Sequence, residues 1–111
     1  MAADYASRHA DALSGLILQG AYPADGVDLT ATRFPSISLL AEHDLVADAA
    51  TVRGGLARLS PSSRLEVIPG SVHAFFGRYG PQQGDGVPTV DRAAAEKSIL
   101  EAIVGYLQAL K

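Results

Sequence analysis

Two residues in this sequence, Asp44 and His73, have types and surroundings suited to proton-transfer chemistry. Asp44 ends the apolar run PSISLLAEHD, and His73 follows a second apolar run in RLEVIPGSVHAFFGRYG. A carboxylate that accepts the Nδ1–H of an imidazole fixes the tautomer of the ring. It also stabilises the imidazolium that forms when the ring takes up a proton. The pair therefore predicts an acid–histidine relay in which His73 is the base and Asp44 orients it.

Short apolar segments that alternate with helical segments must position this pair. We expect strands at 15–19, 35–41 and 65–68, and helices at 3–12, 49–59 and 91–110. This alternation is typical of a parallel sheet covered on both faces, which is the α/β class. Functional residues of such a sheet lie just beyond the carboxyl ends of its strands, where Asp44 and His73 both fall. We expect the two side chains to lie within direct or one-water hydrogen-bond reach.

Other interpretations of these residues remain open. Asp44 alone could cap a turn, and His73 alone could be an ordinary loop residue. His43, Asp44, Asp48 and His73 together have the residue types of a metal site. Adjacent residues rarely point at one ion, however, and no H-x-x-x-H spacing occurs, so we expect no bound metal. His9 lies in a helical segment and is expected to be solvated.

The glycine-rich segment after His73, GRYGPQQGDGVP, does not match a phosphate-binding loop. It lacks both the G-x-x-x-x-G-K-[ST] and the G-x-G-x-x-G pattern. Phe75, Phe76 and Tyr79 are expected to pack around the histidine loop, with a role in a substrate pocket as the alternative. Asp48 and Asp91 stand where N-caps of the second and third helices belong.

Length and composition narrow the function classes. The chain has 111 residues, enough for one small domain, with 48% hydrophobic and 19% charged residues. A net charge of −3 without a basic stripe argues against nucleic-acid binding. The absence of cysteine excludes disulfides and thiolate metal sites. No apolar run reaches the ~20 residues of a membrane span. The cellular location is left open, with the cytoplasm as the default.

Several segments resemble a known family. LILQGAYP, DLTATRFPSISLLAEHDLVAD, RLEVIPGSVHAFFGRYGPQQGDGVPT and the closing amphipathic helix are similar to the C-terminal half of the α/β-hydrolase fold. They lie nearest the small bacterial hydrolases often labelled α/β-hydrolase fold-5. The resemblance implies a partial, three-layer parallel sheet of about three strands with flanking helices. It also implies that Asp44 is the triad acid and His73 the triad base, with Asp48 a weaker candidate for the acid. The family needs no cofactor.

The chain departs from this family where a nucleophile is expected. The family's Gly-x-Ser-x-Gly elbow should stand just before the first helix, and no such motif occurs here. Ser14 precedes its strand and cannot occupy a strand-to-helix elbow. The family's oxyanion hole also draws on an earlier loop. We therefore expect residues 1–111 to form a single domain that is the C-terminal portion of a larger hydrolase fold, and we leave open whether Met1 is the true start.

Two functions follow from these expectations. The first is a serine hydrolase for an ester, thioester or similar acyl substrate, with the isolated chain inactive because it lacks the nucleophile. The alternative is a non-catalytic α/β module that dimerises or binds a protein partner. If the chain is a fragment, the edge of strand 15–19 has no lysine, proline or bulge to protect it, so we expect the isolated chain to self-associate through that edge, aggregate or stay partly molten. A Gly-x-Ser-x-Gly motif encoded upstream would favour the hydrolase.

Overall fold

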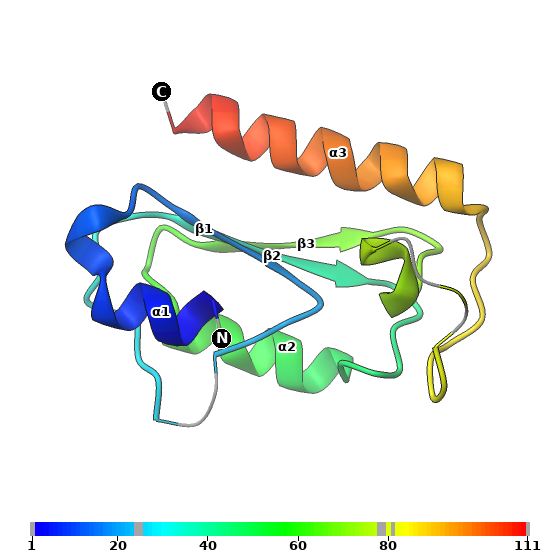
Figure 1. The fold of residues 1–111 in the computed structure, drawn as a ribbon, viewed down its shortest axis with the longest axis horizontal. Helices are drawn as coiled ribbons and strands as arrows, with labels where there is room; N and C mark the ends of the chain where they lie inside the picture. The colour runs from blue at the N-terminus through cyan, green and yellow to red at the C-terminus, as the bar shows by residue number, and fades with distance from the viewer. Residues whose placement is uncertain (1, 24–25, 78–79, 81, 111) are drawn as a thin grey trace.

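The computed structural model describes residues 2–23, 26–77, 80 and 82–110 as a small α/β layered fold. Its elements in chain order are α1 (Ala2–Arg8), η1 (Ala10–Ala12), β1 (Leu16–Gln19), β2 (Ser36–Ala41), α2 (Ala49–Gly55), η2 (Leu56–Arg58), β3 (Arg64–Ile68), η3 (His73–Phe76) and α3 (Arg92–Ala109). The elements labelled η are single 3₁₀ turns. Figure 1 shows α3 on one face of the sheet and α1 with α2 on the other.

The sheet has three parallel strands in the order β1-β2-β3. Ile17 pairs with Ile37 between the first two strands, and Leu39 pairs with Glu66 between the last two. Every residue of β2 is buried, because this central strand is covered by helices on both faces. The α/β class and the three-strand parallel sheet predicted from the sequence are confirmed. All three strands run the same way, so the loops that follow them lie at one end of the molecule.

Apolar side chains from alternate strand positions build a core on each face of the sheet. One cluster lies under α3 and contains Ile37, Leu39, Ile68, Ile99, Ala102 and Tyr106. The opposite face carries two clusters, one with Leu16 and Leu18 against Ala3 and Ala6, and one with Leu40 against Val52. Burial of each large aliphatic side chain contributes roughly 1.5–3 kcal/mol. The strands that carry the two candidate loops are therefore held firmly from both sides.

The two predicted helix caps are both present. Asp48 Oδ2 accepts the backbone N–H of Thr51 at 3.2 Å, and Asp91 Oδ1 accepts the N–H of Ala94 at 2.8 Å. The second helix is shorter than expected, since its α-helical part ends at Gly55 and continues as the turn η2. A Cβ at Gly55 would lie 2.9 Å from the Cβ of Tyr22, so glycine here allows the helix to pack closely.

Two large side chains on the outer helices, Tyr5 and Leu107, are exposed. Tyr5 is 55% exposed and stacks on the ring of His9, whose centroid lies 4.0 Å away. His9 itself is exposed, as predicted. Leu107 is 48% exposed. It lines an apolar groove of about 530 Å³ at the start of β1, with Leu16 among the other lining residues.

Tyr106 joins β1 to β2 at the amino end of the sheet. Its hydroxyl donates to the carbonyl oxygen of Pro35 at 2.6 Å and accepts the N–H of Leu16 at 3.0 Å. Burial raises the pKa of the Tyr106 hydroxyl, and the Leu16 N–H opposes this only in part, so the phenol stays protonated and can donate. Gly15 is required beside it, since a Cβ there would lie 2.3 Å from the hydroxyl oxygen. None of the helices in the described residues is long and apolar enough to cross a lipid bilayer.

Candidate active site

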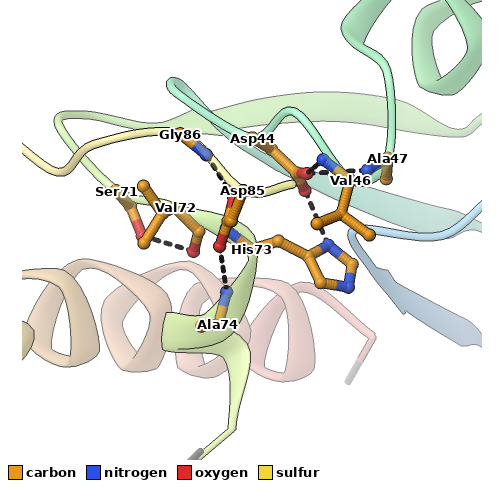
Figure 2. Close-up of polar contacts among 9 residues, drawn as sticks. All are labelled: Asp44, Val46, Ala47, Ser71, Val72, His73, Ala74, Asp85 and Gly86. Atoms are coloured by element: carbon orange, nitrogen blue, oxygen red, sulfur yellow. Dashed lines mark hydrogen bonds and ion pairs between the residues drawn. The ribbon is translucent and has the colours of Figure 1, made fainter. Parts of the chain in front are cut away.

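Asp44 and His73 meet at the carboxyl end of the sheet, on the loops that follow β2 and β3. The Nδ1 atom of His73 lies 2.7 Å from Oδ2 of Asp44 (Figure 2). A carboxylate oxygen accepts, so the ring must donate from Nδ1. The proximity expected from the sequence is confirmed, and it is direct, with no room for a bridging water at this distance.

The second oxygen of Asp44 is anchored by its own loop. Oδ1 accepts the backbone N–H groups of Val46 at 2.9 Å and Ala47 at 2.7 Å. The Asp44 side chain has no solvent exposure. Asp44 therefore caps a turn and contacts the histidine at the same time, so the capping interpretation does not exclude the contact with His73. The two N–H bonds prevent the carboxylate from rotating away from the ring.

His73 opens the turn η3, and its ring remains partly accessible. The His73 side chain is 22% exposed. The ring of Phe76 stands edge-on to the imidazole, with centroids 6.3 Å apart and an interplanar angle of 82°. Within the described residues, no hydrogen bond reaches Nε2 of His73. One ring nitrogen is thus held by a buried acid and the other is open to a reactant.

Gly20, the residue after β1, borders the histidine ring on a third side. Its φ is +60°, a left-handed conformation that glycine adopts without steric cost. A Cβ at this position would lie 2.8 Å from Nδ1 and 2.9 Å from Cε1 of His73, and 3.1 Å from Phe76 Cε2. The loops after all three strands therefore contribute to the site, and the first does so through the absence of a side chain.

The structure adds Asp85, which sequence reasoning did not single out. Asp85 Oδ1 accepts the N–H of His73 at 3.2 Å and of Gly86 at 2.8 Å, and Oδ2 accepts the N–H of Ala74 at 2.9 Å (Figure 2). An aspartate between two glycines signals local bonding to backbone N–H groups. The sequence could not identify N–H groups that lie eleven and twelve positions earlier in the chain.

Other residues considered from the sequence lie away from this pair. Asp48 caps α2 and makes no contact with His73. The Nε2 atom of His43 lies 3.5 Å from both a Glu42 carboxylate oxygen and the Thr89 hydroxyl. Ser14 lines the groove at the amino end of β1, far along the sheet from His73. In the described residues, no group of three or more His, Cys, Asp or Glu side chains is arranged to hold a metal ion.

The aromatic residues of the histidine loop partly match their expected role. Phe76 packs against the apolar cluster under α3 as well as against the imidazole. The guanidinium of Arg92 lies over the ring of Phe75, 4.8 Å from its centroid. Tyr79 lies outside the described residues. Both phenylalanines are thus occupied in packing the loop, as the sequence suggested.

A histidine that is bound to a buried acid through one ring nitrogen can use the other nitrogen to take a proton from a hydroxyl. It can then return this proton to a leaving group. Comparison with known proteins agrees with the fold that carries this pair. A family model described as the alpha/beta hydrolase family matches residues 1–97. Neither the curated proteins nor the solved structures gave a significant match. Because the match spans most of its length, this chain belongs to the alpha/beta hydrolase family.

Proposed function

We propose that Asp44 and His73 are the acid and the base of a Ser-His-Asp triad that hydrolyses an ester, thioester or similar acyl substrate. The observation that carries the proposal is the 2.7 Å contact between Asp44 Oδ2 and His73 Nδ1, combined with the open Nε2 of a partly exposed ring. In this role His73 is a catalytic residue, and Asp44 orients it.

The proposed reaction follows acyl transfer through a serine. His73 Nε2 removes the proton of the serine hydroxyl while the oxygen bonds to the acyl carbon. Asp44 stabilises the imidazolium, whose Nδ1–H points at its carboxylate. The bond to the leaving oxygen or sulfur then breaks, and the proton passes from Nε2 to that atom. A water molecule repeats the sequence and releases the carboxylic acid, so no cofactor is consumed.

The serine in this proposal comes from a segment that precedes the sequence given. Two described serines are engaged elsewhere: Ser60 Oγ donates to the Phe34 carbonyl, and Ser71 Oγ donates to that of Val72. None of the described serines hydrogen-bonds to Nε2 of His73. In the α/β-hydrolase arrangement the nucleophile stands on a strand-to-helix elbow earlier in the chain than the acid and the histidine.

The test compares the 111-residue chain with any longer product of the same gene. We expect no turnover of nitrophenyl esters and no fluorophosphonate labelling for the chain alone. We expect a Gly-x-Ser-x-Gly within about twenty residues upstream, and labelling of that serine in the longer protein. His73→Ala should abolish its turnover, whereas His9→Ala, the matched exposed histidine, should retain it. Robust turnover by the 111-residue chain, lost on His73→Ala, would contradict the upstream position of the serine.

A second candidate function is self-association as a non-catalytic module, with another copy of this chain as the partner. The observation that favours it lies at β1, which pairs only with β2 in the described chain. The apolar groove of about 530 Å³ lies beside this edge. A cooperative, well-packed dimer without any upstream serine motif would favour this candidate over the hydrolase.

A further inference from the structure

The turn that carries His73 has no cap of its own. Val72 occupies the N-cap position of η3, and its apolar side chain makes no capping hydrogen bond. The first N–H groups of a helical turn have no partner within the turn and need an acceptor from elsewhere. The carboxylate of Asp85 supplies it, accepting the N–H of His73 at 3.2 Å and of Ala74 at 2.9 Å.

The same segment is pressed against the loop that carries Asp44. The backbone N–H of Leu45, the residue next to the acid, lies near enough to the Asp85 carboxylate to help lower its pKa. A Cβ at Gly86 would lie 1.8 Å from the carbonyl oxygen of His43, so the two backbones touch at this point. Asp85 is thus bonded to the backbone of His73, and its neighbour Gly86 packs against the backbone of the acid loop.

The charge of Asp85 agrees with this arrangement. Burial alone would raise the pKa of its carboxyl, but the N–H groups of Ala74, Gly86, His73 and Leu45 together outweigh burial and lower it. An ionised carboxylate forms stronger hydrogen bonds to N–H groups than a neutral acceptor does. The hydrogen bonds that hold the histidine turn are therefore charge-assisted at neutral pH.

We propose that Asp85 is a positioning residue, whose carboxylate holds the backbone of the histidine turn on a segment that packs against the backbone of the acid loop, and so fixes the contact between Asp44 and His73. Asp85 touches neither the imidazole nitrogens nor the Asp44 carboxylate, and it acts through the main chain of both loops. Its importance for catalysis rests on the proposed function, but its effect on the Asp44–His73 contact does not.

The test follows the ring proton shared by Asp44 and His73, using NMR on the 111-residue chain. A proton held between Nδ1 and a buried carboxylate gives a downfield resonance that exchanges slowly with water. Asp85→Ala should raise its exchange rate roughly tenfold or more, as expected when a charge-assisted hydrogen bond that restrains the loop is lost. Asp85→Asn keeps one acceptor oxygen and should give an intermediate rate, which is a partial rescue.

Asp48→Ala is the matched control. Asp48 also caps a helical turn, by accepting the backbone N–H of Thr51, but it forms no hydrogen bond with the histidine turn or with Asp85. The Asp48→Ala variant should reduce stability while leaving the exchange rate of the ring proton unchanged. An exchange rate within about twofold of the unmodified chain in Asp85→Ala, or in Asp85→Asn if the alanine variant does not fold, would overturn the proposal. Failure to find a nucleophile upstream would refute the hydrolase function and leave this result intact.

Discussion

At the carboxyl end of the sheet three carboxylates join neighbouring loops, whereas at the amino end the side-chain contacts between segments come from uncharged hydroxyls beside an apolar groove. Glu42 accepts the N–H of Gly70 at 2.8 Å, and Asp44 and Asp85 add the contacts around His73. At the opposite end the Tyr106 hydroxyl bridges Leu16 and Pro35. The hydroxyls of Ser60 and Ser63 bond there to the Phe34 carbonyl and the Ser36 N–H. Hydrogen bonds to a charged carboxylate are stronger than those between uncharged groups, whereas apolar packing has little directional demand. We therefore expect substitutions at the carboxyl end to change the chemistry, and those at the amino end to change stability and association.

The largest expected effect comes from Asp44→Asn at the carboxyl end. An amide turned toward Nδ1 would donate instead of accept and would force the wrong tautomer of His73. In the catalytically active protein kcat should fall by about 10³–10⁴-fold. The remaining oxygen can still accept the Val46 and Ala47 N–H groups, so we expect the free energy of unfolding to change by only about 1 kcal/mol. Asp48→Asn is the control, and a comparable loss of kcat there would contradict the assignment of Asp44 as the acid.

Gly20→Ala should move the imidazole without removing any polar contact. The new Cβ would lie within 3 Å of two ring atoms of His73. Displacement of a catalytic group by about 1 Å is expected to lower kcat about 10²-fold. The positive φ adds about 1–2 kcal/mol of destabilisation. Gly26→Ala separates the two effects, because Gly26 has a φ of +85° and open space around it. Equal activities for the two variants would show that ring displacement does not matter.

The contact between Asp44 and His73 illustrates what the sequence could predict. Asp44 and His73 each follow an apolar strand, and the strands are adjacent in a parallel sheet, so their meeting follows from topology alone. The caps Asp48 and Asp91 are local signals and could be predicted from their own neighbourhoods. The α/β class likewise follows from the alternation of apolar runs with helices. In each case the information lies within a few residues or within one regular rule of chain connection.

The contacts of Tyr106, Asp85 and Gly20 could not be predicted. They join residues that are distant in sequence, or they depend on where the backbone lies. Tyr106 reaches Leu16 and Pro35 across 90 and 71 positions, yet its place on an apolar helix face predicts only burial. Asp85 acts on main-chain N–H groups, which carry no residue-type signal. Gly20 contributes by lacking a side chain beside His73. The requirement for glycine there follows from the position of the imidazole ring, which the sequence does not give.

Tyr106→Phe tests the amino end of the sheet. The variant leaves the Leu16 N–H and the Pro35 carbonyl without the hydroxyl, which should lower the free energy of unfolding by roughly 1–3 kcal/mol. Urea unfolding measures this change. Tyr5→Phe, at an exposed tyrosine, should stay within about 0.5 kcal/mol. The downfield ring-proton resonance of His73 should be unchanged in both, and its loss in Tyr106→Phe would show that the two ends of the sheet are coupled.

Leu107→Glu tests whether the groove at the amino end mediates self-association. Leu107 is 48% exposed and lines the groove beside β1, so a charge there should weaken a dimer about tenfold or more. Leu100→Glu is the control on the same helix, since Leu100 is 61% exposed but does not line the groove. Sedimentation at micromolar concentration compares the two variants. A monomer for the unmodified chain would refute the proposed self-association.

The smallest expected effect is on the acid stability of Asp85→Asn. The pKa of Asp85 is lowered in the folded chain, because N–H bonds from Ala74, Gly86, His73 and Leu45 outweigh its burial. Its ionised form therefore stabilises the fold above the unfolded pKa of about 3.9, and this contribution is lost as the pH falls through the lower folded pKa. The variant lacks this contribution at every pH.

We expect the difference in unfolding free energy between the unmodified chain and Asp85→Asn to shrink steadily from about pH 5 to pH 2, as measured by urea unfolding. Asp28 also has a lowered pKa, caused first by the hydroxyl of Thr30 and then by its N–H. It is present in both proteins, so its titration cancels in the difference. A difference that stays constant over this range would mean that the Asp85 carboxylate holds the two loops through its shape and not its charge. The carboxyl end of the sheet would then differ from the amino end in geometry alone.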